Sequence, residues 1–520
     1  MEKAGAQPAA DNLHMQAAVP GRKVGCALIT VDVQPSGLYK NLHDLIRMAF
    51  PGHALREGPA MDQVGHMIIT AAERDKQVFF CGLINVDDRK TGARQKYGLA
   101  AEGVNHRSQL TKLARTFTYQ LLGQHLEYDF NPYGILTGVR PVKIVHRLLD
   151  QGEGEDDIRI KLEKEYLLSP AKARLLVAVA GANRDCLPTA AEASEQLSIY
   201  IGIPFCPSRC YYCSFPGAIL NDYGRQLRPF VEALLVEMDT VGSFIRERGW
   251  QVQTVYLGGG TPTLLHDADL LSIFEVLHRY YISASTREIT IEAGRPDTLN
   301  PARLRELHQA GVTRICINPQ TMHDQTLHLI GRQHNAQMIV EAVEWARAAG
   351  IQLLNMDLIV GLPGENLECY RTSAEKVLAL RPDNITVHTL AAKRGSPMLE
   401  KEGRTGIPDH AAGVAQGVAD LQRIFQAQGF NPYYLYRQKY MRAGLENIGY
   451  TKPDHACLYN IQMIEERQTI VGMGGGASSK FFNPTDGSLS SIHNPKDPYS
   501  YQKSLPGLIA RKVDKLGALN

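Results

Sequence analysis

The chain has 520 residues, of which 44% are hydrophobic, so it can bury a substantial core and hold two to four domains. Its 56 Lys and Arg residues nearly balance its 54 Asp and Glu residues, which argues against nucleic acid or a membrane surface as a partner. No apolar run approaches the length of a membrane span. Nine cysteines without a secretory signal predict a cytoplasmic protein in a reducing compartment.

The first part of the chain is expected to stand apart from the rest. Residues 1–23 are rich in Ala and polar residues and predict a disordered tail. Residues 24–192 are expected to form an N-terminal α+β domain, with a charged, solvated run at 155–164. The patterns of apolar residues predict strands at 24–33 and 78–86 and helices at 109–124 and 162–181.

A compact basic segment lies within this domain, at Arg140, Lys143, His146 and Arg147. One hypothesis is a clamp for carboxylates, because Arg binds carboxylates in a bidentate fashion. The plainer interpretation is a solvated helix start, which we favour because basic residues mostly lie on surfaces.

From residue 193 onward, apolar strands alternate with amphipathic helices, which predicts a parallel sheet with right-handed crossovers. The α/β pattern fits an incomplete (β/α)6 barrel over residues 193–407 or a doubly wound sheet. Residues 408–520 are expected to form a small C-terminal domain whose basic end, from Gln502, is partly mobile. The six strands are predicted at 198–204, 253–257, 288–292, 314–318, 351–359 and 384–388.

Three cysteines, Cys206, Cys210 and Cys213, follow the first of these strands in the spacing C-x3-C-x2-C. Three thiolates on one loop can hold three irons of a cubane cluster and leave the fourth iron open for a ligand, which indicates a redox enzyme. A disulfide would leave one thiol over, and a structural zinc site needs four ligands. Cys186 and Cys316 lie too far along the chain to supply the fourth.

This loop, with Tyr212 before its last cysteine, resembles the signature of radical S-adenosylmethionine (SAM) enzymes. The preceding Tyr200-Ile-Gly-Ile-Pro-Phe is similar to the oxygen-independent coproporphyrinogen III oxidase group, and residues 131–143, 446–451 and 459–468 most resemble its HemZ-type, coproporphyrinogen dehydrogenase-like branch. The resemblance spans roughly residues 132–480, and it implies the barrel and not the doubly wound sheet.

The resemblance also implies the cofactors and partners. It implies a [4Fe-4S] cluster on the three cysteines and two SAM molecules, and the cleavage of SAM to a 5′-deoxyadenosyl radical that abstracts hydrogen. It implies an oxidoreductase of haem biosynthesis with a tetrapyrrole substrate, first of all coproporphyrinogen III. A low-potential electron donor such as flavodoxin or ferredoxin would then be a partner.

Candidate cofactor-binding residues follow the strands. Taken alone, Gly259, Gly260 and Thr261 form a turn, but they resemble the glycine motif whose backbone grips the amino group of SAM. Glu292 ends the third strand, where a carboxylate is either solvated or turned toward a cationic, hydroxyl-rich ligand such as SAM. By resemblance, a second SAM contacts Gln320, Arg332 and Asp357, and further SAM contacts come from Tyr200, Tyr212, Ala391 and Ser478.

Two classes of function stay open. The first is oxidative decarboxylation of two propionates of coproporphyrinogen III to give protoporphyrinogen IX, or a radical reaction on another tetrapyrrole. The second is a haem-binding chaperone, because Phe215 stands where the oxidases carry a further cysteine and the chaperones share this Phe. The chaperones' His-Asn motif is replaced here by Glu446-Asn447. For a haem carrier, the candidate axial ligands are His388, His455 and Tyr450.

Overall fold

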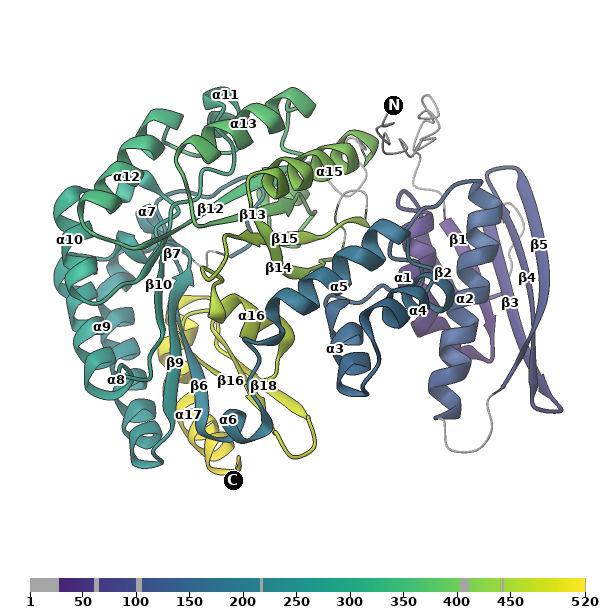
Figure 1. The fold of residues 1–520 in the computed structure, drawn as a ribbon, viewed down its shortest axis with the longest axis horizontal. Coiled ribbons are helices and arrows are strands. Elements are labelled where there is room, and N and C mark those ends of the chain that lie inside the picture. Colours follow the sequence, from purple (N-terminus) through teal and green to yellow (C-terminus); the bar gives the residue numbers. More distant parts are fainter. Residues whose placement is uncertain are drawn as a thin grey trace, which may run out of the picture.

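The computed structural model describes residues 28–59, 65–99, 105–215, 218–402, 411–439, 441 and 444–519. Figure 1 shows an N-terminal sheet at one end of the molecule and a larger, curved sheet wrapped by helices at the other. The tail expected at residues 1–23 lies outside the described residues. In the described part of the chain, no helix is long and apolar enough to cross a membrane.

The N-terminal region forms a five-stranded sheet in the order β2-β1-β3-β4-β5. Its core lies on one face only, where Val31, Met67 and Phe80 pack against Leu45 and Phe117 of the two helices. The expected strands and the helix near 109–124 are therefore present. The elements are β1 (Leu28–Gln34), α1 (Tyr39–Ala49), β2 (Ala54–Glu57), β3 (Gly65–Arg74), β4 (Gln77–Val86), β5 (Arg89–Gly98) and α2 (His106–Leu126).

The helix predicted at 162–181 is wrong in extent, because the chain breaks between two helices there. Leu167 adopts a left-handed backbone conformation with φ of 58°. Ser169 then caps the next helix by accepting a hydrogen bond from the Lys172 amide, and Pro170 occupies its first turn. The charged run expected to be solvated forms most of the preceding helix. The connecting helices are α3 (Val142–Asp150), α4 (Glu155–Glu165), α5 (Pro170–Arg184) and α6 (Ala190–Glu195).

Six parallel neighbours at the centre of the large sheet confirm the predicted strand–helix alternation. They are β6 (Gln196–Ile203), β9 (Gln251–Gly259), β10 (Glu288–Glu292), β11 (Arg314–Cys316), β12 (Leu353–Val360) and β13 (Asn384–Thr389). Helices cover the outer face of this sheet (Figure 1). They are α8 (Leu227–Glu247), α9 (Asp267–Tyr280), α10 (Pro301–Gln309), α12 (Ala336–Ala348) and α13 (Leu367–Ala379), with the short α11 (Asp324–Leu329) added after β11.

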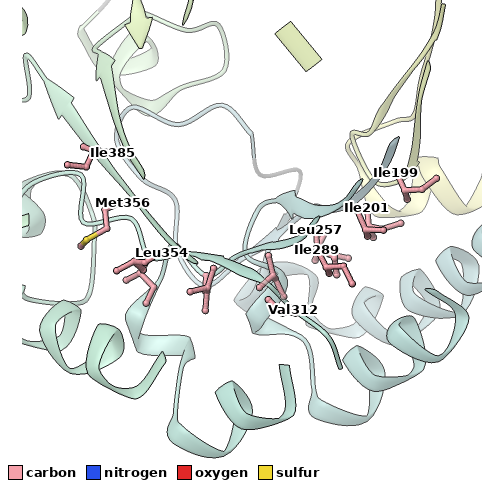
Figure 2. Close-up of a cluster of buried hydrophobic side chains, with 14 of the residues drawn as sticks. Ile199, Ile201, Leu257, Ile289, Val312, Leu354, Met356 and Ile385 are labelled. Carbon is pink, nitrogen blue, oxygen red and sulfur yellow. The ribbon is translucent and has the colours of Figure 1, made fainter. Parts of the chain in front are cut away.

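Side-chain alternation along the strands separates the core from the interior of the barrel. Ile199, Ile201, Leu257, Ile289 and Leu354 are buried between the sheet and the helices, as Figure 2 shows. Because successive strand residues point to opposite faces, the residues between them face the concave side. The carboxyl ends of the parallel strands meet at one rim, so loops that follow them are brought together.

The C-terminal segment extends this sheet at both edges. On one side β14 (Asn431–Tyr436) and β15 (Asn447–Thr451) add antiparallel strands beyond β13, and on the other β16 (Thr469–Gly474) pairs parallel with β6. The sheet therefore runs across the boundary expected at residue 408, and the domain boundaries stay predictions. The remaining elements are α14 (Pro397–Glu402), α15 (Ala411–Ala427), α16 (Leu458–Glu465), β17 (Ser478–Phe482), β18 (Leu489–His493) and α17 (Pro498–Gly517).

The mobile end expected from Gln502 is wrong, because α17 continues to Gly517 and buries Tyr501, Leu508 and Leu516. Its one buried cation, Lys512, is held by Glu237 of α8. A buried ion pair of this kind ties the last helix to the outer layer of the barrel.

Candidate functional site

The three cysteines lie on the loop that follows β6. Cys206 and Cys210 are buried and Cys213 is half-buried. Cys206 belongs to the short strand β7 (Phe205–Cys206), which pairs with β8 (Ala218–Ile219) before α7 (Leu220–Tyr223). The Tyr211 amide donates to the Ile330 carbonyl at 3.0 Å, which ties the loop to the segment after β11. The two segments are far apart in the sequence, and the fold brings them together at the rim of the barrel.

Hydrogen-bond donors surround the cysteine sulfurs. The Thr261 hydroxyl lies 3.3 Å from the Sγ of Cys206, and an Arg295 Nη donates to the Sγ of Cys210 at 3.2 Å. The Phe215 amide donates to the Sγ of Cys213 at 3.4 Å. Donors and a guanidinium favour sulfur in its anionic form, which is the form that ligates iron.

The burial of these thiols has an electrostatic consequence. Burial raises the pKa of the Cys206 thiol to about 11, although the Thr261 hydroxyl opposes this. A thiolate there is thus stable only with a strong positive partner such as iron. No three His, Cys, Asp or Glu side chains among the described residues are placed to hold one metal ion. A cubane makes a different demand, because each thiolate binds its own iron, and the three-cysteine loop fits it.

The glycine segment after β9 lies against the cysteine loop. The Gly260 amide donates to the Ile203 carbonyl at 2.6 Å, and the Thr261 amide donates to the Phe205 carbonyl at 2.8 Å. A Cβ at Gly260 would lie 2.3 Å from the Phe205 oxygen, so no other residue fits without moving the backbone. The segment is therefore shaped by contact with the cysteine loop, and its grip on SAM stays a prediction.

Arg332 joins three segments of the rim. Its guanidinium is buried and donates to the carbonyls of Gly294, at 2.6 Å, and Asn318, at 2.8 Å. The same side chain donates to the Tyr212 hydroxyl at 3.1 Å. The two residues assigned to SAM by resemblance, Tyr212 and Arg332, are thus in direct contact and fix the cysteine loop to the ends of β10 and β11.

Gln320 connects the β11 loop to β12 in a strained conformation. Its φ is 69°, in the left-handed region that few residues other than glycine adopt. Its amide donates to the Asp357 carbonyl and its own carbonyl accepts from the Ile359 amide, both at 2.8 Å. The side-chain Oε1 is buried without a hydrogen-bond partner among the described residues. A buried, unpaired amide oxygen of this kind can accept a hydrogen bond from a ligand or from a bound water.

Two carboxylates face the concave side of the sheet. Glu292 accepts a hydrogen bond from the Tyr256 hydroxyl at 2.9 Å, yet burial raises the pKa of its carboxyl to about 7. Burial also acts on Asp357, but His388, 3.4 Å away, and the Asn355 amide at 2.8 Å outweigh it and lower the Asp357 pKa. The site therefore holds one carboxylate that stays ionised and one that titrates near neutrality.

The raised pKa of Glu292 predicts a pH-dependent stability. The unfolded chain ionises this carboxyl near its ordinary pKa, 4.5, but the folded chain ionises it only near 7. Its neutral form therefore contributes stability that is complete below pH 4.5 and is lost as the pH rises through 7. We expect Glu292→Gln to gain stability relative to the parent chain between pH 5 and 8, measured by urea unfolding of the cofactor-free protein. A difference that stays constant over this range would contradict the assignment.

A tyrosine stack lines the same concave side. Tyr256 and Tyr459 have ring centres 4.4 Å apart, and Tyr200 stacks on both at 6.1 and 5.9 Å. The Tyr459 hydroxyl is buried without a hydrogen-bond partner in the described part of the chain. Tyr200, which the sequence assigned to SAM binding, is thus one of three stacked tyrosines whose hydroxyl groups could bind a ligand.

Ala391 and Ser478 lie at the two ends of this arrangement. Ala391 is buried and forms a bridge to Met441 just after β13. Ser478 begins β17, where its hydroxyl lies 2.9 Å from a ring nitrogen of His493 on β18, an exposed pair. Their contacts with SAM stay predictions.

Sequence reasoning missed Arg295 and Tyr256. Both could have been found from the sequence. Arg295 follows the third strand, and Tyr256 alternates with apolar residues of the second strand, which places its side chain on the concave face. Tyr459 comes from α16, whose position over the barrel no local pattern indicates.

The basic segment is not a carboxylate clamp, and only part of it is the solvated helix start expected from the sequence. Arg140 and Lys143 both pair with Glu466, so they are not free to clamp a ligand carboxylate. The segment stands at the start of α3, where Arg147 is exposed but His146 is buried within 3.6 Å of Glu465. It attaches the connecting helices to the end of α16.

Several known proteins resemble this chain. The model of the "Radical SAM superfamily" matches residues 200–377. The "Oxygen-independent coproporphyrinogen-III oxidase-like protein HemZ" of Bacillus subtilis is 37% identical over 385 residues, which cover 74% of this chain and 77% of the relative. The "Heme chaperone HemW" of the same organism is 30% identical, over 48% of this chain and 65% of the chaperone. The coproporphyrinogen III oxidase HemN of Escherichia coli has 22% identity and a TM-score of 0.49, over 61% of this chain and 71% of that one.

A buried three-cysteine loop at the rim of a (β/α)6 barrel defines a radical SAM protein. The chain belongs to this superfamily, in the group of oxygen-independent coproporphyrinogen-III oxidase-like proteins. Its cofactors are accordingly a [4Fe-4S] cluster and SAM. The donors around the sulfurs and the unpartnered polar atoms of Gln320 and Tyr459 fit such an occupied site.

Proposed function

We propose that the chain is a radical SAM oxidoreductase of haem biosynthesis that converts two propionates of coproporphyrinogen III into vinyl groups, giving protoporphyrinogen IX without oxygen. The observation that carries the proposal is the buried cysteine loop on a barrel whose concave side presents carboxylates and tyrosines. The 37% identity with an oxidase-like relative supports this substrate class over others.

The proposed reaction balances in atoms and electrons. When bound, the cluster and SAM supply a carbon-centred radical that removes one hydrogen atom from the substrate. Each propionate loses this hydrogen, carbon dioxide and one electron, and each SAM consumes one electron to give methionine and 5′-deoxyadenosine. An external reductant supplies the electron that each SAM consumes, and an electron acceptor takes the electron that each propionate releases, so two electrons enter and two leave in each turnover. One coproporphyrinogen III and two SAM thus give one protoporphyrinogen IX, two carbon dioxide, two methionine and two 5′-deoxyadenosine.

The residues of this chain have distinct proposed roles. Cys206, Cys210 and Cys213 hold the cluster, and Thr261 and Arg295 favour their anionic form. Tyr212 on this loop and Gly259 and Gly260 beside it would contact the first SAM. Glu292 and Asp357 offer carboxylates to the cationic and hydroxyl groups of SAM. A second SAM would contact Gln320, Arg332 and Asp357, and the stacked Tyr200, Tyr256 and Tyr459 would exclude water from the barrel.

The proposal is tested by supplying the reconstituted protein anaerobically with SAM, a strong reductant and coproporphyrinogen III. We expect protoporphyrinogen IX together with about two 5′-deoxyadenosines per turnover, measured by mass spectrometry. SAM cleavage without loss of carbon dioxide from this substrate would refute the substrate and point to another tetrapyrrole.

A second candidate function is haem transfer, favoured by Phe215 and by the similarity to a haem chaperone. Of the candidate axial ligands, Tyr450 is fully buried and His455 is held 3.0 Å from Asp383. His388 also lies near a carboxylate, 3.4 Å from Asp357, but it faces the concave side with the other site residues, so it is the candidate that we test. Stoichiometric haem binding that is lost in His388→Ala, observed by absorbance, would support this function. Unchanged haem binding in that variant would remove His388 from it.

A further inference from the structure

The cysteine loop has one side that the described protein does not cover. Its inner side rests on an apolar cluster that includes Ile330, Leu362 and Leu390. The same loop carries Phe215, which is 57% exposed. The Phe215 amide is bonded to the Sγ of Cys213, the least buried of the three cysteines. An exposed ring therefore stands one hydrogen bond away from a cluster ligand.

Two lysines lie near this ring or near the backbone beside it. The Lys393 ammonium lies 5.5 Å from the centre of the Phe215 ring. The exposed Lys496, from the segment before α17, donates to the carbonyl of the neighbouring Ser214 at 3.0 Å. Arg209 lies on the same loop and pairs with Glu400 at 3.0 Å, the one carboxylate these contacts include. These contacts include three cations and one carboxylate, although the chain as a whole is nearly neutral.

We propose that Phe215, Lys393 and Lys496 form the docking surface for an acidic, low-potential one-electron carrier protein. The inference rests on the proposed function, because only a cluster that cleaves SAM needs repeated reduction from outside. An apolar contact framed by cations fits a partner with an acidic rim around a redox group, and the charges would steer its approach. Because Cys213 is the least buried of the three cysteines and is bonded to the Phe215 amide, a partner seated on Phe215 would lie close to the cluster.

The test compares two reductants on the same cluster. The probe is an acidic bacterial flavodoxin in its fully reduced form, mixed anaerobically with reconstituted protein, and the readout is the loss of visible cluster absorbance without SAM or tetrapyrrole. We expect Lys496→Glu to slow reduction by flavodoxin about tenfold and Phe215→Ala to slow it several-fold. Reduction by dithionite, a small reductant that needs no docking surface, is expected to stay within about twofold. The flavodoxin rate of the parent chain is expected to fall with ionic strength, and that of Lys496→Glu to fall less.

A matched variant and a milder substitution complete the design. Lys90→Glu makes the same charge change on the exposed edge strand β5, at the far end of the molecule (Figure 1), and is expected to leave both rates unchanged. Lys496→Gln removes the charge without reversing it and serves if Lys496→Glu holds less iron. Equal slowing with both reductants, equal slowing in Lys90→Glu, or an unchanged flavodoxin rate in Lys496→Glu and Phe215→Ala would overturn the proposal. Protoporphyrinogen formed with dithionite would still uphold the proposed function in that case.

Discussion

Cys206→Ser is expected to leave the protein folded but unable to keep a [4Fe-4S] cluster, and SAM cleavage is expected to disappear. The reason is local, because Cys206 is the most enclosed ligand position and sits between the glycine segment and β8. A serine hydroxyl is a harder, less acidic ligand and does not replace a thiolate on iron. The measurements are iron and sulfide content after reconstitution and the yield of 5′-deoxyadenosine.

Two further variants test whether the loss of the cluster is specific to this cysteine and its surroundings. Thr261→Val removes the hydroxyl 3.3 Å from the Cys206 sulfur and keeps its shape, so a loss of about 10- to 100-fold in activity or metal retention is expected. Cys81→Ser changes an exposed cysteine of β4 and is expected to behave like the parent chain. Full iron retention in Cys206→Ser would show that this residue is not a cluster ligand.

The strands and the cysteine loop were predictable because their signals are local. In a run such as 253–257, the apolar residues indicate a strand, and their alternation indicates which side chains face the helices. A parallel sheet then places the loops that follow its strands at one rim. Glu292 and Asp357 could therefore be assigned to the site before their contacts were known. The break between α4 and α5 was also readable, since Ser169 and Pro170 form a helix start.

The edges of the sheet were not predictable, because they depend on pairing between segments far apart in sequence. β16 pairs with β6 across more than 250 residues, and its register is set by contact with Gly202. The role of Arg332 shows the same limit. Its position suggested a ligand contact, but its hydrogen bonds to Gly294 and Asn318 exist only once three loops have met.

Glu237→Ala is expected to lower the free energy of unfolding by about 3–5 kcal/mol, because it leaves a buried charge without its partner. Glu237 is fully buried and accepts hydrogen bonds from Tyr501 at 2.6 Å and from the Gly474 amide at 2.8 Å, besides its pair with Lys512. Urea unfolding measures the change. Glu232→Ala, on the same helix but in an exposed pair with Arg228, is expected to stay within about 0.5 kcal/mol of the parent.

The effect of Glu237 should extend to the site. The Gly474 that it holds packs on Gly202, and a Cβ at the next residue, Gly475, would lie 2.6 Å from a Pro204 side-chain carbon, two residues before Cys206. Glu237→Ala is therefore expected to retain less iron than Glu232→Ala. The double variant Glu237→Gln/Lys512→Met, which removes both charges, is expected to recover part of the lost stability. If Glu237→Ala were no less stable than Glu232→Ala, the buried pair would not be what anchors α17 and the glycine loop behind the cysteines.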